Sequence, residues 1–149
     1  MYLLDTNHCS NIILGNTFIL NRLANIDNTL IATCVVVQGE LVDMAERSQR
    51  KENNLALVES FFRGLYVYHI DETTATIYGQ LKALLFNKFA PKERNKRRKT
   101  KMLDLGFDEN DLWIAAIALQ HNLTIVSADS DFSRMQQAKQ LSVESWLKN

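Results

Sequence analysis

Short apolar runs alternate along the chain with longer segments whose hydrophobic residues recur at helical spacing. The runs cover residues 2–4, 29–33, 67–70 and 124–127, and residues 141–146 add a fifth candidate near the C-terminal end. Strands that are buried on both faces of a parallel sheet have this short and nearly uninterrupted apolar pattern. We therefore expect an α/β fold with a four- to five-stranded parallel sheet and helices on both of its faces.

The segments between the runs predict the helices. Residues 35–45 begin with three valines but continue in a pattern that favours a helix, and large apolar residues between 55 and 65 recur every three or four positions. A further helix begins at Asp71, and the cationic segment that follows it breaks at Pro91. Residues 110–120 are apolar nearly all round, which is typical of a buried helix, with Asn110 as its expected N-cap.

Length and composition indicate one ordinary globular domain, spanning residues 1–149. The hydrophobic fraction is 46% and the charged fraction 23%. Cys9 and Cys34 are too few for a disulfide framework, and we expect small buried thiols in a reducing cytosol. No apolar run is long enough to span a membrane, and Asp5 and His8 stand where a signal peptide needs an apolar core. We therefore expect a cytoplasmic protein with no membrane partner.

The net charge is zero, but it is unevenly distributed. Residues 88–101 contain eight Lys or Arg and one Glu, so the rest of the chain is acidic. We expect a basic loop at about residues 88–104, and cationic segments of this kind bind the phosphates of single-stranded nucleic acid. The side chains assigned to RNA binding on this basis are Lys92, Arg94, Lys96, Arg97, Arg98 and Lys99. A flexible loop that contacts only solvent is the alternative.

Carboxylates from segments remote in sequence are expected at one edge of the sheet. The acids at these positions are Asp5 after the first strand, Glu40 in the helix after the second, Asp111 in the buried helix, and Asp129 and Asp131 after the fourth. Ligands of open α/β sheets bind beyond the carboxyl ends of the strands. Two carboxylates about 4 Å apart repel by ~4 kcal/mol at an effective dielectric of 20, so a compensating cation is needed. Oxygen ligands suit Mg²⁺ or Mn²⁺, and no set of His and Cys stands at zinc spacing.

A divalent cation in an acidic cluster indicates phosphoryl chemistry, because the cation activates water and stabilises the leaving oxygen. Each acid alone has an ordinary explanation, such as helix capping by Asp5, so the prediction depends on their convergence. His8 could orient a phosphate or act as an acid, or it could be a surface or capping residue. An aspartyl-phosphate phosphatase would need a second Asp where this chain has Asn7. A non-catalytic module that binds RNA or another partner stays an alternative.

Four segments resemble the motifs of a known nuclease family. Residues 2–7 (YLLDTN), 110–116 (NDLWIAA) and 125–132 (IVSADSDF) resemble the first, third and fourth acid motifs of PIN-domain nucleases, and residues 37–41 fit the second. The tail, residues 141–147, is similar to that of the VapC toxins of bacterial toxin–antitoxin pairs. The resemblance implies a single PIN-like domain and a Mg²⁺- or Mn²⁺-dependent endoribonuclease that cuts RNA such as tRNA. It also implies a homodimer inhibited by a cognate antitoxin.

The resemblance also implies roles for individual residues. The catalytic and metal-binding acids would be Asp5, Glu40, Asp111 and Asp129. Thr6 is the small hydroxyl beside the first acid, and Asn7 is a second expected substrate contact. The fourth acid position is doubled, and we favour Asp129 over Asp131 because it lies closer to the end of the strand, with Asp131 as a further metal ligand. An RNA-processing nuclease that is not a toxin is the alternative within the family.

Overall fold

One parallel sheet organises the chain. The structure, a computed structural model, describes residues 1–147, so the last two residues of the expected domain 1–149 lie outside the described residues. The strands are β1 (Tyr2–Leu4), β2 (Ile31–Cys34), β3 (Tyr66–Tyr68), β4 (Thr124–Val126) and β5 (Val143–Glu144). Their spatial order is β3-β2-β1-β4-β5, and every pairing is parallel. The predicted α/β fold is confirmed, including the fifth strand at the edge.

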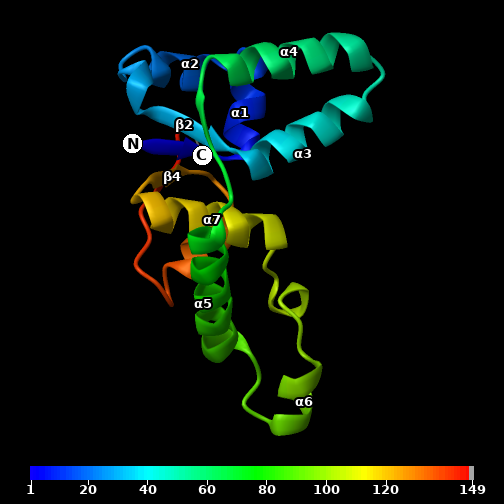
Figure 1. The fold of residues 1–149 in the computed structure, drawn as a ribbon, viewed down its shortest axis with the longest axis vertical. Coiled ribbons are helices and arrows are strands. Elements are labelled where there is room, and N and C mark those ends of the chain that lie inside the picture. The colour runs from blue at the N-terminus through cyan, green and yellow to red at the C-terminus, as the bar shows by residue number, and fades with distance from the viewer. Residues whose placement is uncertain (148–149) are drawn as a thin grey trace.

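Helices cover both faces of the sheet. They are α1 (Thr6–Ile13), α2 (Thr17–Leu23), α3 (Val35–Glu46), α4 (Lys51–Arg63), α5 (Glu72–Phe89), α6 (Arg94–Lys99), α7 (Glu109–His121) and α8 (Ser130–Met135). In Figure 1, α1 to α4 lie on one side of the sheet, while α5 and α7 lie on the other. Short 3-10 turns occupy Asn28–Leu30 and Leu103–Leu105.

The central helix α7 is buried as its sequence predicts. Leu112, Ala115 and Ile117 are 0% exposed, together with other members of the helix, because sheet and neighbouring helices surround it. Its expected N-cap was wrong by two positions. Asp108, rather than Asn110, caps the helix, since the Asp108 side chain accepts the Asn110 backbone N–H at 2.7 Å. Asn110 is therefore inside the first turn.

The first strand passes directly into helix α1, for which the sequence pattern predicted no range and indicated only a possible capping role for Asp5. Asp5 is the N-cap of α1, and its backbone N–H donates to Val126 O of β4 at 3.1 Å. The same residue therefore ends a central strand and begins a helix. This double constraint fixes the position of its carboxylate.

The basic segment has more structure than the expected loop. Helix α5 ends at Phe89, before Pro91, as predicted, but the expected loop at 88–104 contains α6 and a 3-10 turn. Consecutive Lys and Arg residues are good helix formers, and positive charge in a last helical turn is favourable. In Figure 1, α6 lies at the far end of α5, away from the sheet. Cys9 and Cys34 are buried and unpaired, as expected. No described helix combines the length and apolar character that a membrane span requires.

Candidate active site

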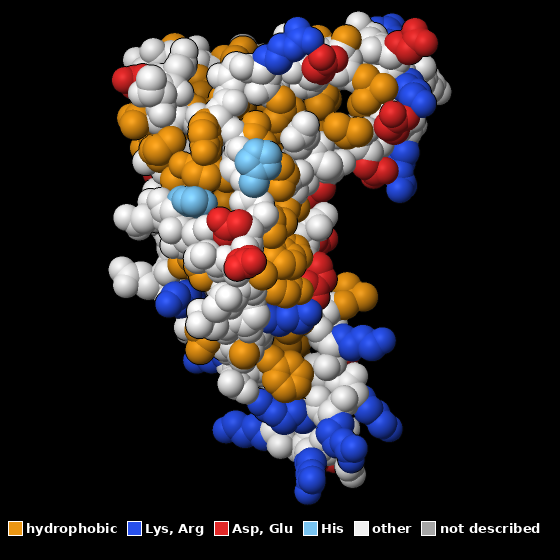
Figure 2. All heavy atoms as spheres, in the orientation of Figure 1, with side chains coloured by type: hydrophobic (Ala, Val, Ile, Leu, Met, Phe, Trp, Pro, Cys, Tyr) orange, Lys and Arg blue, Asp and Glu red, His pale blue; other side chains and the backbone are white. Residues whose placement is uncertain are grey.

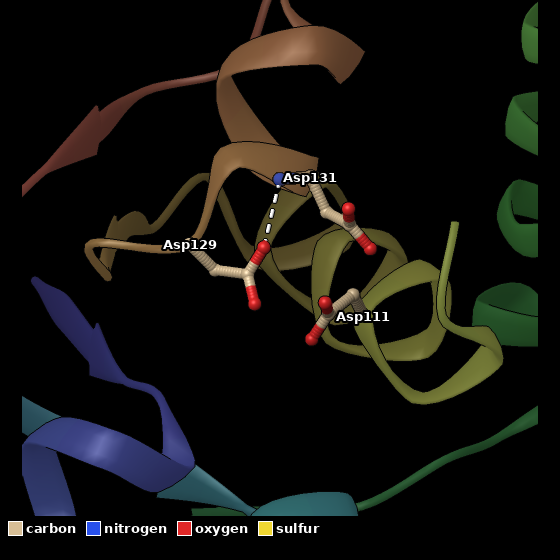
Figure 3. Close-up of side chains that lie close together, drawn as sticks. All are labelled: Asp111, Asp129 and Asp131. Atoms are coloured by element: carbon tan, nitrogen blue, oxygen red, sulfur yellow. Dashed lines mark hydrogen bonds between the residues drawn. The ribbon is translucent and has the colours of Figure 1, made fainter. Parts of the chain in front are cut away.

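Three aspartates from two helix starts converge at the carboxyl edge of the sheet. Asp111 lies in the first turn of α7, Asp129 is the N-cap of α8, and Asp131 lies in the first turn of α8. One carboxylate oxygen from each lies within 4.8 Å of the others. Figure 3 shows the three side chains directed toward one another, with Asp129 Oδ1 accepting the backbone N–H of Asp131 at 2.8 Å. These acids are the ones that the sequence assigned to strand end and buried helix.

The two candidates for the fourth acid, Asp129 and Asp131, lie in different environments. Asp131 is buried, at 8% exposure, and its Oδ2 accepts the backbone N–H of Asp108 at 2.9 Å. Asp129 is exposed and caps α8. Both carboxylates face Asp111, so both can contribute an oxygen to one ion. The choice of Asp129 as the fourth catalytic acid stays a prediction.

Asp111 carries the strongest sign of mutual repulsion. Burial and then the negative charges of Asp129 and Asp131 raise its pKa from 3.8 to about 8, with a further contribution from Asp108. Without a cation, the cluster therefore holds a proton near neutral pH. A bound divalent ion would displace that proton, because it stabilises the ionised carboxylate.

Glu40 and Asp5 are two further acids of the predicted site, and the charge of Asp5 acts on Glu40. Burial raises the pKa of the half-buried Glu40, and the charges of Asp108 and Asp5 add to this effect. Polar contacts with Thr6 and Asn110 lower the Glu40 pKa in opposition. The Thr6 hydroxyl faces Glu40, yet its oxygen is buried and makes no hydrogen bond of good geometry within residues 1–147.

The structure thus brings three of the five predicted acids into one compact group. The compact group contains Asp111, Asp129 and Asp131, whereas Asp5 and Glu40 interact electrostatically with each other. Asp108 links these acids, because its charge acts on both Glu40 and Asp111. Asp108 was absent from the sequence prediction. Its position two residues before the expected cap is the signal that could have identified it.

The donor set fits a hard divalent cation. Among the described residues no Lys or Arg pairs with Asp111, Asp129 or Asp131. The nearby Lys82 pairs instead with Glu109, at 2.8 Å. Carboxylate oxygens are the ligands that Mg²⁺ and Mn²⁺ prefer, and the three side chains are already close enough to share one ion.

The basic residues lie apart from the acids. Figure 2 shows acidic side chains along a concave part of the surface, at its right side, whereas Lys and Arg gather at the lower end around α6. Lys92, Arg94, Arg98 and Lys99 are exposed there. We call this cationic end, residues 92–99, the basic tip. Arg97 packs against α5 there, with its guanidinium 4.7 Å from the Phe86 ring and 2.8 Å from Asn87 Oδ1.

A groove lies along α5. It has a volume of about 690 Å³, runs between α5 and residues 100–103, and ends at Glu109 in the first turn of α7. Phe86, Lys82 and Lys101 line it. The residues that line this groove include neither the predicted RNA-binding cations nor the clustered aspartates, although Glu109 lies two positions before Asp111 on α7.

Comparisons with known proteins identify the family of the chain. The family model of the PIN domain matches residues 2–138. The chain is 32% identical over 90 residues to a protein of Shigella flexneri described as tRNA(fMet)-specific endonuclease VapC, covering 60% of this chain and 68% of that protein. The protein of the same description from Salmonella typhimurium has the same identity and coverage.

Solved structures give the same result for the fold. VapBC2 from Rickettsia felis, bound to a fragment of promoter DNA, is similar with a TM-score of 0.78 and 25% identity, covering 97% of this chain and 98% of that one. DNA-bound VapBC from Salmonella typhimurium gives a TM-score of 0.76 and 26% identity, with 98% of each chain covered.

Proposed function

The chain belongs to the PIN-domain family, and from this premise we propose that it is a metal-dependent endoribonuclease, the toxin of a toxin–antitoxin pair. The observation that carries the proposal is the convergence of Asp111, Asp129 and Asp131 with no basic side chain of the described residues paired to them. A nuclease needs such a cluster to hold its cation, whereas a binding module gains nothing from the repulsion.

The acids would hold Mg²⁺ or Mn²⁺, which when bound would activate water and stabilise the charge that develops on the phosphate under attack. Asp111, Asp129 and Asp131 would supply oxygen ligands, and Asp5 and Glu40 would complete the acidic wall. Asp5 is held by the end of β1 and by its cap of α1, so its carboxylate cannot move far from the site. The exposed Asn7 is suited to contact the substrate, whereas the buried hydroxyl of Thr6 would act on the substrate only through the neighbouring Glu40.

RNA would reach the acids along the groove beside α5. The exposed cations Lys92, Arg94, Arg98 and Lys99 would bind phosphates, and Lys96 and Arg97 would add charge to the same tip. An acidic site repels a polyanion, and a cationic tip offsets that repulsion. A substrate that contacts both must span the groove, which favours a structured RNA such as tRNA.

The partners follow from the family and from the two similar complexes. Their descriptions name VapBC, so we propose a cognate antitoxin that inhibits this chain. We further propose that the chain forms a homodimer and acts in the cytoplasm, where both structured RNA and an antitoxin are available.

The direct test is cleavage of purified tRNA and of total RNA by the wild type with Mg²⁺ or Mn²⁺. We expect discrete products with metal and none with EDTA. Asp5→Asn and Asp111→Asn should each lower kcat at least about 100-fold, since they remove charge where the cation binds. The matched control is Asp43→Asn, because Asp43 is an exposed acid on α3 whose ion-pair partner among the described residues is Arg47.

Two results would contradict the proposal. If wild-type protein binds RNA but cuts none with either metal, the chain is the non-catalytic module. If Asp111→Asn cuts as fast as Asp43→Asn, the acids are not the catalytic site. If the protein cleaves RNA but its expression does not slow bacterial growth, the assignment as a nuclease holds and the assignment as a toxin is wrong.

A further inference from the structure

His8 is a fully buried histidine in contact with the first acid of the site. It lies in the first turn of α1 and is 0% exposed. Its ring Nδ1 lies 2.9 Å from Asp5 Oδ1, and its backbone N–H donates to the same oxygen at 2.8 Å. On the opposite side of the ring, Nε2 accepts the backbone N–H of Trp146 at 3.1 Å. Both ring nitrogens are therefore engaged.

These contacts fix the protonation pattern of the ring. Because Nε2 accepts a hydrogen bond from a backbone N–H, it carries no proton, and the ring proton stands on Nδ1. Nδ1–H then donates to Asp5 Oδ1. Neither nitrogen is free to contact a phosphate or to exchange a proton with a substrate. The surface, phosphate-orienting and acid interpretations of His8 are therefore all wrong.

The two hydrogen bonds from His8 fall on one oxygen of Asp5. Oδ1 accepts both, so within residues 1–147 the other oxygen, Oδ2, accepts none. The arrangement holds Asp5 in one orientation and keeps one charged oxygen for the site.

The C-terminal segment holds the other side of the ring. Trp146 follows β5, is 7% exposed, and packs edge-on against Tyr2 with ring centroids 5.2 Å apart. Its indole N–H donates to Glu144 Oε1 at 2.6 Å. The backbone at Trp146 is thus anchored on both β1 and β5, and it can hold His8 in place.

We propose that His8 is a positioning residue for the nuclease site, which links the C-terminal segment to Asp5 and orients that carboxylate toward the bound cation. The inference rests on the proposed function, because it assigns to Asp5 a part in holding the metal. Groups that hydrogen-bond to metal-binding side chains typically change metal affinity or activity about 10- to 100-fold when replaced.

The first test is the tautomer of His8 in metal-free protein. Nitrogen-15 NMR of the histidine rings should show His8 with a protonated Nδ1 and an unprotonated Nε2. A proton on Nε2 would overturn the proposal, because Nε2 could then not accept the backbone N–H of Trp146. This measurement needs neither metal nor RNA, so it is independent of the proposed activity.

The second test compares two amide variants with matched polarity. His8→Asn places an N–H donor near the position of Nδ1 but cannot reach Trp146, whereas His8→Gln can reach Trp146 but has lost the donor to Asp5. We expect His8→Gln to bind Mn²⁺ about 10- to 100-fold more weakly than the wild type and His8→Asn to retain most of the affinity. A purely structural role predicts that affinity follows the Tm of the variants instead.

Kinetics separate this proposal from the proposed function. In His8→Gln we expect kcat to fall while KM for RNA is unchanged, since the basic tip is untouched. Equal Mn²⁺ affinity in His8→Gln and wild type would overturn the positioning role. If the wild type binds Mn²⁺ but cuts no RNA, the proposed function fails, while the tautomer and the Mn²⁺ affinities still test His8.

Discussion

Replacing Asp111 by Asn should make the metal-free protein more stable at neutral pH while removing RNA cleavage. Burial and the charges of Asp129 and Asp131 raise the Asp111 pKa to about 8 in the folded protein, against 3.8 for an ordinary aspartate. The folded state therefore binds the proton more tightly than the unfolded chain. Stability from this group is complete below the ordinary pKa and is lost as the pH rises through the folded pKa.

The magnitude follows from the size of this displacement. Each tenfold change in proton affinity corresponds to about 1.4 kcal/mol. The full pKa difference would correspond to several kcal/mol. Because Asp111 is only partly buried, solvent screening reduces the expected destabilisation to about 2 kcal/mol near pH 7. For a chain of this length, that difference corresponds to roughly 4–8 °C in Tm.

The assay is urea or thermal unfolding in EDTA at several pH values from about 5 to 8. We expect the free energy of unfolding of the wild type to fall across this window, and that of Asp111→Asn to fall much less. Asp43→Asn is the control, because this exposed acid pairs with Arg47, is not among the charges that raise the Asp111 pKa, and should leave the slope unchanged. Mn²⁺ should raise the Tm of the wild type by mass action and that of Asp111→Asn far less.

The reasoning would be refuted if Asp111→Asn were no more stable than the wild type in EDTA at pH about 7.5. An identical pH slope in the two proteins would have the same meaning. Either outcome would show that the three carboxylates do not repel one another in solution as their separation implies.

Three further predictions concern the elements around the site. Gly106→Ala should lower stability by about 1 kcal/mol or more in urea unfolding, because φ is +82° there and a Cβ would meet Arg134 Nη1 at 3.0 Å; an unchanged midpoint would refute this. Replacing Arg98 and Lys99 together by Gln should raise KM for RNA and reduce the salt dependence of binding by roughly 0.7 in log–log slope per contact, whereas an unchanged slope would make the tip a solvated surface. Asp71→Ala should cost about 1 kcal/mol in the same unfolding assay, since Asp71 caps α5, and no loss would contradict that capping role.

Much of the fold could be predicted from local patterns. Residues 35–45 follow helical spacing despite three valines, and α3 covers Val35–Glu46. The apolar run 124–127 corresponds to β4. Periodicity identifies such elements because an amphipathic helix buries every third or fourth side chain, whereas a fully buried strand is a short continuous apolar run. The helices α1 and α8 were missed because they are short and polar, and their caps, Asp5 and Asp129, had been interpreted as site residues.

The sequence by itself determined which acids follow the strands, because the carboxyl ends of parallel strands share one edge of the sheet. Only the tertiary structure decided which of them approach one another, since separations of a few ångströms depend on how α3, α7 and α8 pack. The same holds for Asp108, whose role depends on cap geometry, and for His8, whose partner Trp146 lies 138 residues away in sequence. The local sequence pattern predicts which side chains a segment buries. Contacts between distant segments depend instead on how the whole chain packs.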